Sequence, residues 1–207
     1  MEEQMAIEKI RNAVEIATKK IIMIDDQDKI NESYNSKRFP HEIFLNAMIY
    51  HELISSSNFP FNDVYMEYLY PKEASSGEKY SSGDFVIKNV FKGNDIENLF
   101  LEVKILADDS KSESFILNSG DHFDTDIKKL KKLMEYNDSV PVKGVVIIAN
   151  LTRYLSDDRE YKPISILLET LKKILTKGKY SNDIVFILSD NFRAIAITAG
   201  EIKRYKE

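Results

Sequence analysis

The stretch from Ser81 to Leu106 reads SSGDFVIKNVFKGNDIENLFLEVKIL, and the rest of the chain is organised around it. Both of its ends are rich in β-branched and aromatic residues, a composition typical of short β-strands. Between them, the segment Lys92–Asp95 supplies Gly and Asn where a hairpin turn needs them. The stretch therefore predicts a β-hairpin, with strands over 81–87 and 99–106.

Folding this hairpin is expected to bring Asp84, on the first strand, close to Glu102 and Lys104 on the second. Because alternate side chains of a strand share a face, Glu102 and Lys104 project together and Val103 projects the other way. Two neighbouring carboxylates repel each other, which makes them a natural seat for a hard divalent cation such as Mg²⁺. A nearby ammonium group can orient a metal-bound water or stabilise charge on a phosphate. The hairpin therefore predicts a metal site suited to phosphate chemistry.

An Asp after a small residue, followed at a distance by Glu-x-Lys on a strand, resembles the motif of the PD-(D/E)XK nuclease superfamily. Gly83-Asp84 stands in the place of Pro-Asp. Glycine replaces the proline of the motif, at a position that takes no part in the chemistry. Glu102-Val103-Lys104 stands in the place of (D/E)XK. The resemblance implies that Asp84, Glu102 and the Val103 carbonyl hold Mg²⁺, for which Mn²⁺ can substitute. It also implies that Lys104 positions the attacking water, which makes Asp84, Glu102 and Lys104 the catalytic residues.

Other acidic residues are candidates for the same site. In this superfamily the helix before the core sheet often supplies a further carboxylate, and such a helix is expected over 41–55. Glu42 is preferred over Glu52 for this role. In the alternative interpretation, Glu42 is an N-terminal charge favoured by the helix dipole and Glu52 is a solvated side chain. Glu67, in a strand expected over 64–70, is either near the metal or a cross-strand partner.

Composition limits the classes of protein to consider. The chain has 207 residues, which suits one ordinary domain with its own core. The absence of cysteine excludes a disulfide framework and a thiolate zinc site, and it fits a reducing cytoplasm. We expect no signal peptide and no membrane span. A net charge of −5 argues against nucleic-acid binding by the whole surface and leaves room for a local basic track.

The segments before the hairpin predict helices. An amphipathic helix over 3–24 is expected to pack on the core, with dimerisation as the alternative role. Its apolar stripe consists of Ile7, Ile10, Val14, Ala17 and Ile21. The polar segment 25–39 is expected to be a loop or linker.

The segments after the hairpin predict further helices and strands. The expected elements are a helix over 126–136, an apolar strand over 142–150 parallel to the Glu102 strand, a helix over 163–176, and two strands over 184–188 and 192–198 joined by a two-residue turn at Asp190-Asn191. By residue type, Asp121, His122, Asp124 and Asp126 resemble the ligands of a second metal site. In the preferred interpretation, Asp124 or Thr125 caps the first of these helices and the others are loop charges. The lysines of this helix are either solvated or in contact with backbone phosphates.

This order of elements, αβββαβ, is that of the restriction-endonuclease-like fold, an α/β fold with a mixed central sheet flanked by helices. We therefore expect a single domain over 1–207. Its N-terminal helix and linker span 1–35, its core spans 41–150, and its C-terminal helix and strand hairpin span 151–207.

The resemblance implies a metal-dependent nuclease that hydrolyses phosphodiester bonds of nucleic acid, DNA foremost, in restriction, defence or mobile-element biology. Such a protein would act as a homodimer or within a larger defence complex, away from membranes. The alternative is a catalytically silent subunit of the same fold that binds nucleic acid or a protein partner. A nucleotide-binding α/β enzyme is disfavoured because no Gly-rich phosphate loop follows any expected strand.

Overall fold

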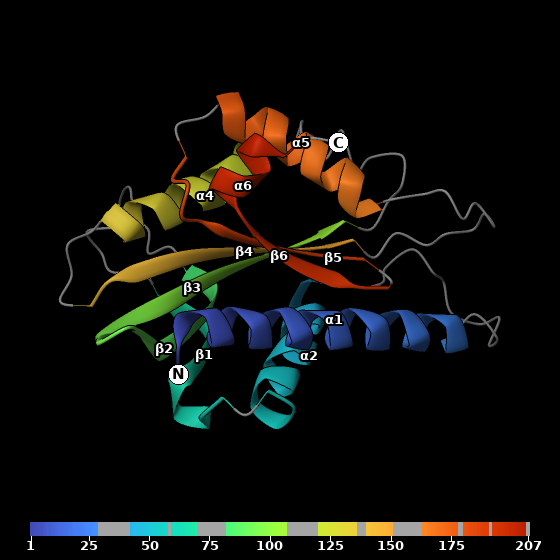
Figure 1. Cartoon of the computed structure of the whole chain (residues 1–207). Helices are drawn as coiled ribbons and strands as arrows, with labels where there is room; N and C mark the ends of the chain where they lie inside the picture. The colour runs from blue at the N-terminus through green and yellow to red at the C-terminus, as the bar shows by residue number, and fades with distance from the viewer. Residues whose placement is uncertain are drawn as a thin grey trace.

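One mixed β-sheet forms the centre of the protein (Figure 1). The computed structural model describes residues 1–28, 42–57, 59–69, 82–106, 120–135, 140–150, 163–177, 180–190 and 192–205. The strands are β1 (Val64–Leu69), β2 (Ser82–Lys92), β3 (Asp95–Leu106), β4 (Val142–Asn150), β5 (Val185–Ser189) and β6 (Ala194–Thr198), and they lie side by side in this order. The pairs β1–β2, β2–β3 and β5–β6 are antiparallel, and the pairs β3–β4 and β4–β5 are parallel.

Helices cover both faces of this sheet. They are α1 (Glu3–Asp28), α2 (Glu42–Ser55), α4 (Gly120–Glu135), α5 (Pro163–Lys177) and α6 (Ala199–Arg204), with a short 3₁₀ helix, η2 (Phe61–Asp63), before β1. Figure 1 shows α1 and α2 on one face of the sheet and α4, α5 and α6 on the other. None of the described helices is long and apolar enough to cross a membrane. The expected α/β architecture, with a mixed sheet flanked by helices, is confirmed.

β4 shows why the sheet needs helices on both faces. Val145 and Ile147 are buried in the core beneath α1 and α2, whereas Val146 and Ile148 are buried in the core beneath α4 and α5. A continuous apolar run fits a strand that is buried on both faces. The bounds of β4 and its parallel pairing with β3 are therefore as predicted.

Gly144 lets α4 approach the sheet closely. A Cβ atom at this position would lie 3.2 Å from both Leu130 Cβ and Met134 Sδ of α4. Both distances are shorter than ordinary van der Waals contact. The glycine therefore seats α4 directly on β4, next to the strand that carries Glu102 and Lys104.

The N-terminal helix packs on the core, as predicted. Ile10, Val14 and Ala17 are fully buried, and α1 lies across the sheet beside α2. The predicted end of this helix is wrong, because α1 continues through residues 25–28, which were expected to belong to a linker. The rest of that expected linker, 29–39, lies outside the described residues.

The start of α4 also differs from its prediction. The helix begins at Gly120, so residues 121–125 lie within it and not in a loop. Neither Asp124 nor Thr125 is therefore its N-cap. Asp126, expected near the first residue of the helix, lies in its second turn.

The hairpin is longer than predicted. β2 runs to Lys92 and β3 begins at Asp95, so most of the segment 88–98, expected as a polar turn, is strand. Gly93 turns the chain with a φ of 65°, a conformation that glycine adopts without strain. The two strands accommodate one register shift, a β-bulge at Asn89, which has a φ of 57°.

The connection between β5 and β6 spans 190–193, so the predicted two-residue turn is wrong. Asp190 closes this loop because its Oδ1 accepts hydrogen bonds from the N–H groups of Phe192 and Arg193. α6, which follows β6 directly, was not predicted.

β6 is the last strand of the sheet, and side chains cover part of its outer edge. Arg11 of α1 donates a hydrogen bond to the Ala194 carbonyl, at 2.9 Å. Glu15 of the same helix accepts one from the Ala194 N–H, also at 2.9 Å. Glu201 accepts a hydrogen bond from the Thr198 N–H at 2.8 Å. Ala194 and Thr198, two of the five residues of β6, thus have outward-facing backbone groups that are hydrogen-bonded to side chains.

Glu97 of β3 is a buried carboxylate close to a second one. It is 4% exposed, and its Oε1 has no hydrogen-bond partner among the described residues. Burial and the nearby Glu3 carboxylate raise the pKa of Glu97, and the ammonium of Lys143 opposes this effect. Lys143 forms an ion pair with Glu3, so the charges here bind the start of α1 to the sheet.

We expect Glu97→Gln to raise the free energy of unfolding at pH 8 by about 1 kcal/mol. The stability that goes with a raised carboxyl pKa is complete below pH 4.5, the ordinary value for Glu, and is lost as the pH rises through the folded-state pKa. The variant should therefore gain stability at pH 8 and little at pH 4. Urea unfolding of both proteins at the two pH values measures this, and an equal effect at both would contradict it.

Candidate active site

The candidate site lies where β2 and β3 separate. The last pair of this ladder is Phe85 with Leu101, while β3 continues beside β4 as far as Leu106. Asp84 is the first residue of β2 beyond the ladder. Its Oδ2 accepts a hydrogen bond from the Val103 N–H at 2.7 Å. The Asp84 carboxylate therefore occupies the place where strand-to-strand hydrogen bonding stops.

The three residues of the Glu-x-Lys motif divide between the faces of β3 as predicted. Val103 is fully buried in the core beneath α1 and α2. Lys104 extends to the opposite face, where its Nζ lies 2.8 Å from Asp126 Oδ2 of α4. Glu102, which is 4% exposed, shares the face of Lys104 because the two residues are two apart. The structure thus brings Asp84 directly beside the segment that carries Glu102 and Lys104.

Helix α2 contributes Asn46 to this site. The Asn46 Nδ2 donates a hydrogen bond to Asp84 Oδ1 at 3.0 Å, so each oxygen of the Asp84 carboxylate accepts one. Asn46 is 7% exposed, and its Oδ1 has no partner among the described residues. An amide oxygen buried without a partner is costly, so its position beside Asp84 points to a ligand or a water. Sequence reasoning missed Asn46, which lies one helical turn after Glu42.

The acidic residues considered for α2 and β1 have different environments. The side chain of Glu42 lies outside the described residues. Glu52 is fully buried and accepts hydrogen bonds from Lys20 Nζ and Ser56 Oγ, both at 2.6 Å, so its interpretation as a solvated side chain is wrong. Glu67 is exposed and has a φ of 49°, in the left-handed region. It lies between two residues that pair with β2, opposite Asp84.

Asp126 lies within α4 and pairs with Lys104, so its interpretation from the sequence as a loop charge is wrong. It is 7% exposed and forms ion pairs with two lysines. Its Oδ2 lies 2.8 Å from Lys104 Nζ, and its Oδ1 lies 2.8 Å from Lys129 Nζ. The spacing of Asp126 and Lys129 on a helix was a visible signal for one of these pairs. The other pair joins α4 to β3.

Burial is the main influence on the ionisation of Asp84. It raises the pKa of this carboxyl, and the nearby Asp126 acts in the same direction. The Val103 N–H, the Lys104 ammonium and Asn46 oppose the rise without cancelling it. Within the protein alone, the negative charge of Asp84 is therefore incompletely balanced, which is a state that a bound cation would relieve.

The donor atoms present suit a magnesium ion. Mg²⁺ prefers oxygen ligands, takes one or two protein carboxylates and keeps several waters. Asp84, Glu102 and the Val103 carbonyl supply such oxygens, and the unpartnered Asn46 Oδ1 is a fourth. Across the described segments, no group of three or more His, Cys, Asp or Glu is arranged to hold a metal. A metal here would therefore depend on backbone, amide, water or phosphate oxygens as well as carboxylates.

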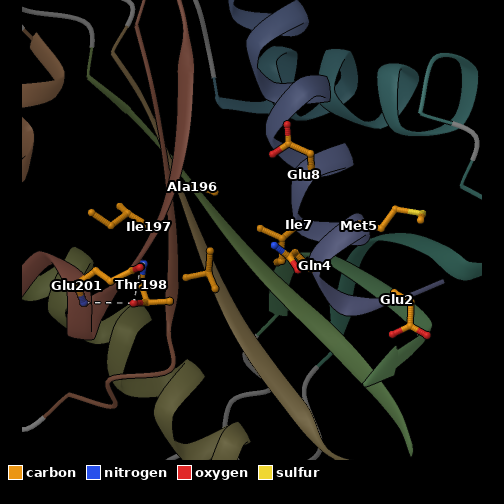
Figure 2. Close-up of a pocket in the computed structure, with 10 residues that line it drawn as sticks. Glu2, Gln4, Met5, Ile7, Glu8, Ala196, Ile197, Thr198 and Glu201 are labelled. Atoms are coloured by element: carbon orange, nitrogen blue, oxygen red, sulfur yellow. Dashed lines mark hydrogen bonds between the residues drawn. The ribbon is translucent and has the colours of Figure 1, made fainter. Parts of the chain in front are cut away.

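The protein also has a groove of about 720 Å³ between the first turns of α1 and strand β6. Figure 2 shows Met5 and Ile7 of α1 on one side and Ala196 and Ile197 of β6 on the other. No residue predicted for the metal site lines it. The groove and the candidate site are therefore separate features.

Protein-family models, curated proteins and solved structures were all compared with this chain, and none matches it.

Proposed function

We propose that this protein is a metal-dependent nuclease with a restriction-endonuclease-like fold, which hydrolyses phosphodiester bonds of nucleic acid, DNA foremost. The observation that carries the proposal is the hydrogen bond between Asp84 Oδ2 and the Val103 N–H, which joins the Asp to the centre of the Glu-Val-Lys motif. The order of helices and strands supports it, because one helix, three antiparallel strands, a helix and a parallel strand follow one another.

In this proposal Asp84, Glu102 and the Val103 carbonyl hold Mg²⁺ or Mn²⁺. When bound, the cation lowers the pKa of a coordinated water and offsets negative charge on the phosphate. Asn46 fixes one oxygen of Asp84, and the Val103 N–H fixes the other, so the carboxylate is held in one orientation. Lys104 orients the attacking water and stabilises charge on the phosphate oxygens. The product strands leave with the phosphate on one of them.

The biological setting that we propose follows from the same resemblance. The protein would act in the cytoplasm, in restriction, defence or mobile-element biology, as a homodimer or within a larger complex. The formal charge of −5 leaves recognition of nucleic acid to a local surface. The lysines of α4 are candidates for this surface, because Lys129 pairs with the same Asp126 carboxylate as Lys104.

The proposal predicts cleavage that depends on a divalent metal. We expect the purified protein to cut labelled DNA in Mg²⁺ or Mn²⁺ and to lose this activity in EDTA, because the cation supplies the activated water. Single- and double-stranded DNA and RNA, tested side by side, identify the polymer. We expect Glu102→Ala and Lys104→Ala each to lower the rate on the order of a hundredfold.

Two negative results have different meanings. If no substrate is cut, calorimetry with Mg²⁺ and Mn²⁺ shows whether the site binds metal. Metal binding that disappears in Glu102→Ala would indicate a competent site that lacks its substrate or partner. If neither cleavage nor metal binding occurs, the enzyme proposal is wrong, and a catalytically silent subunit becomes the better interpretation.

A further inference from the structure

Asp126 lies at the centre of a three-residue charge cluster that the Glu-x-Lys motif does not include. Its two carboxylate oxygens contact two different lysines, Lys104 of β3 and Lys129 of α4, each at 2.8 Å. The Asp126 side chain is 10% exposed, whereas the lysine side chains are 19% and 29% exposed. The carboxylate is thus the inner member of the cluster, and the ammonium groups lie closer to the surface.

The cluster adjoins the carboxylates of the proposed metal site. Asp84 is close enough to Lys104 and Asp126 for both to influence its pKa, and Glu102 is two residues from Lys104 on the same strand. The two ammonium groups therefore face three carboxylates, and a divalent cation held by Asp84 and Glu102 would leave the whole site with one net positive charge. Such a site is suited to an anionic substrate.

We propose that Asp126 is a positioning residue, which fixes Lys104 toward the reacting phosphate and Lys129 toward a neighbouring phosphate of the substrate strand. This inference rests on the proposed nuclease function and extends it by naming a second phosphate contact. A lysine side chain has four flexible carbons, so ordering it costs conformational entropy. If Asp126 already holds the ammonium group in place, this entropy cost is not added to the barrier of the reaction. The alternative is that Asp126 only fastens α4 to β3.

The first test of this inference needs no activity. In protein labelled with ¹⁵N on lysine, ammonium groups held by ion pairs give distinct Nζ signals. We expect Asp126→Asn to shift or broaden the Lys104 and Lys129 signals and to leave the other lysines unchanged. The matched control is Glu135→Gln, which removes the partner of Lys131 on the same helix. Unchanged Lys104 and Lys129 signals in Asp126→Asn would overturn the inference, whether or not the protein cleaves DNA.

The second test separates positioning from support of the fold. Asp126→Asn should lower kcat on the order of tenfold or more, because Lys104 loses its orientation. Asp126→Glu should restore part of this loss, and Lys129→Ala should raise KM for a long strand several-fold. Combining Asp126→Asn with Lys104→Ala should cost little beyond Lys104→Ala alone, because both changes remove one interaction. Glu135→Gln should cleave at the wild-type rate.

The outcomes distinguish failure of the inference from failure of the proposed function. A wild-type protein that cleaves while Asp126→Asn keeps full activity overturns the positioning role alone. A loss in Asp126→Asn that simply adds to that of Lys104→Ala overturns it as well. A wild type that neither cleaves nor binds metal overturns the nuclease proposal, and the catalytic role of Asp126 with it. If Asp126→Asn does not fold, Lys129→Ala still tests the second phosphate contact.

Discussion

Asp84→Asn is expected to reduce metal-dependent cleavage on the order of a hundredfold or more. The change keeps the size of the side chain and an oxygen that can accept the Val103 N–H, but it removes the negative charge. Burial raises the pKa of Asp84, which means that the folded protein disfavours the charged carboxylate at this position. A neutral side chain here would cost less folding free energy. A site that accepts this cost is suited to a cation.

The stability of the same variant makes the test specific. We expect Asp84→Asn to unfold at a free energy equal to or above that of the wild type at pH 8, because no charge has to be buried. Lost cleavage then cannot be attributed to unfolding. Calorimetry with Mg²⁺ should show weaker binding in parallel. Asp95→Asn, an exposed residue next to the hairpin turn, is the matched control and should retain full activity. Full activity in Asp84→Asn would place the chemistry elsewhere.

Phe186→Ala is expected to lower the free energy of unfolding by about 3–5 kcal/mol. Phe186 is a fully buried residue of β5, in the core beneath α4, α5 and α6. Removing its ring leaves a cavity between the sheet and these helices, and the loss is a large part of the roughly 5–15 kcal/mol by which a domain is stable.

A matched control for this change lies six residues further along the chain. Phe192 is 72% exposed, and its replacement by Ala should change stability by less than about 0.5 kcal/mol. Guanidinium unfolding followed by circular dichroism measures both variants. Equal losses in the two variants, or an unaffected Phe186→Ala, would mean that the packing on this face of the sheet is not as described.

The main elements could be predicted because their apolar patterns are strong. The continuous run of β4 and the stripe of α1 each match the burial that they predict. The short helix α6 lacks such a run, yet Thr198 and Glu201 form a capping box, a pattern that the sequence displays. With only Ala199 and Ile202 buried, this six-residue helix has too few apolar positions to display a helical period.

The candidate site could be predicted only as far as chemistry is visible in single residues. Asp84, Glu102 and Lys104 stand out because their order and types resemble a known motif. Asn46 does not, because a carboxamide has no charge and its partner is 38 positions away. The sequence shows Asp126 only as an acidic residue at the start of an expected helix. The packing of α4 on β4 is what places it beside Lys104. Contacts between distant elements decide these roles, and local pattern does not contain them.

The covered edge of β6 has a consequence for crowded solutions of this protein. An unpaired outer strand is a template on which another chain can add, which is the first step of sheet-like aggregation. Here Arg11 and Glu15 bind both backbone groups of Ala194, and Glu201 binds the Thr198 N–H. An incoming strand would have to displace charged side chains at both ends of β6. The helices that stabilise the sheet thus also limit its growth at this edge.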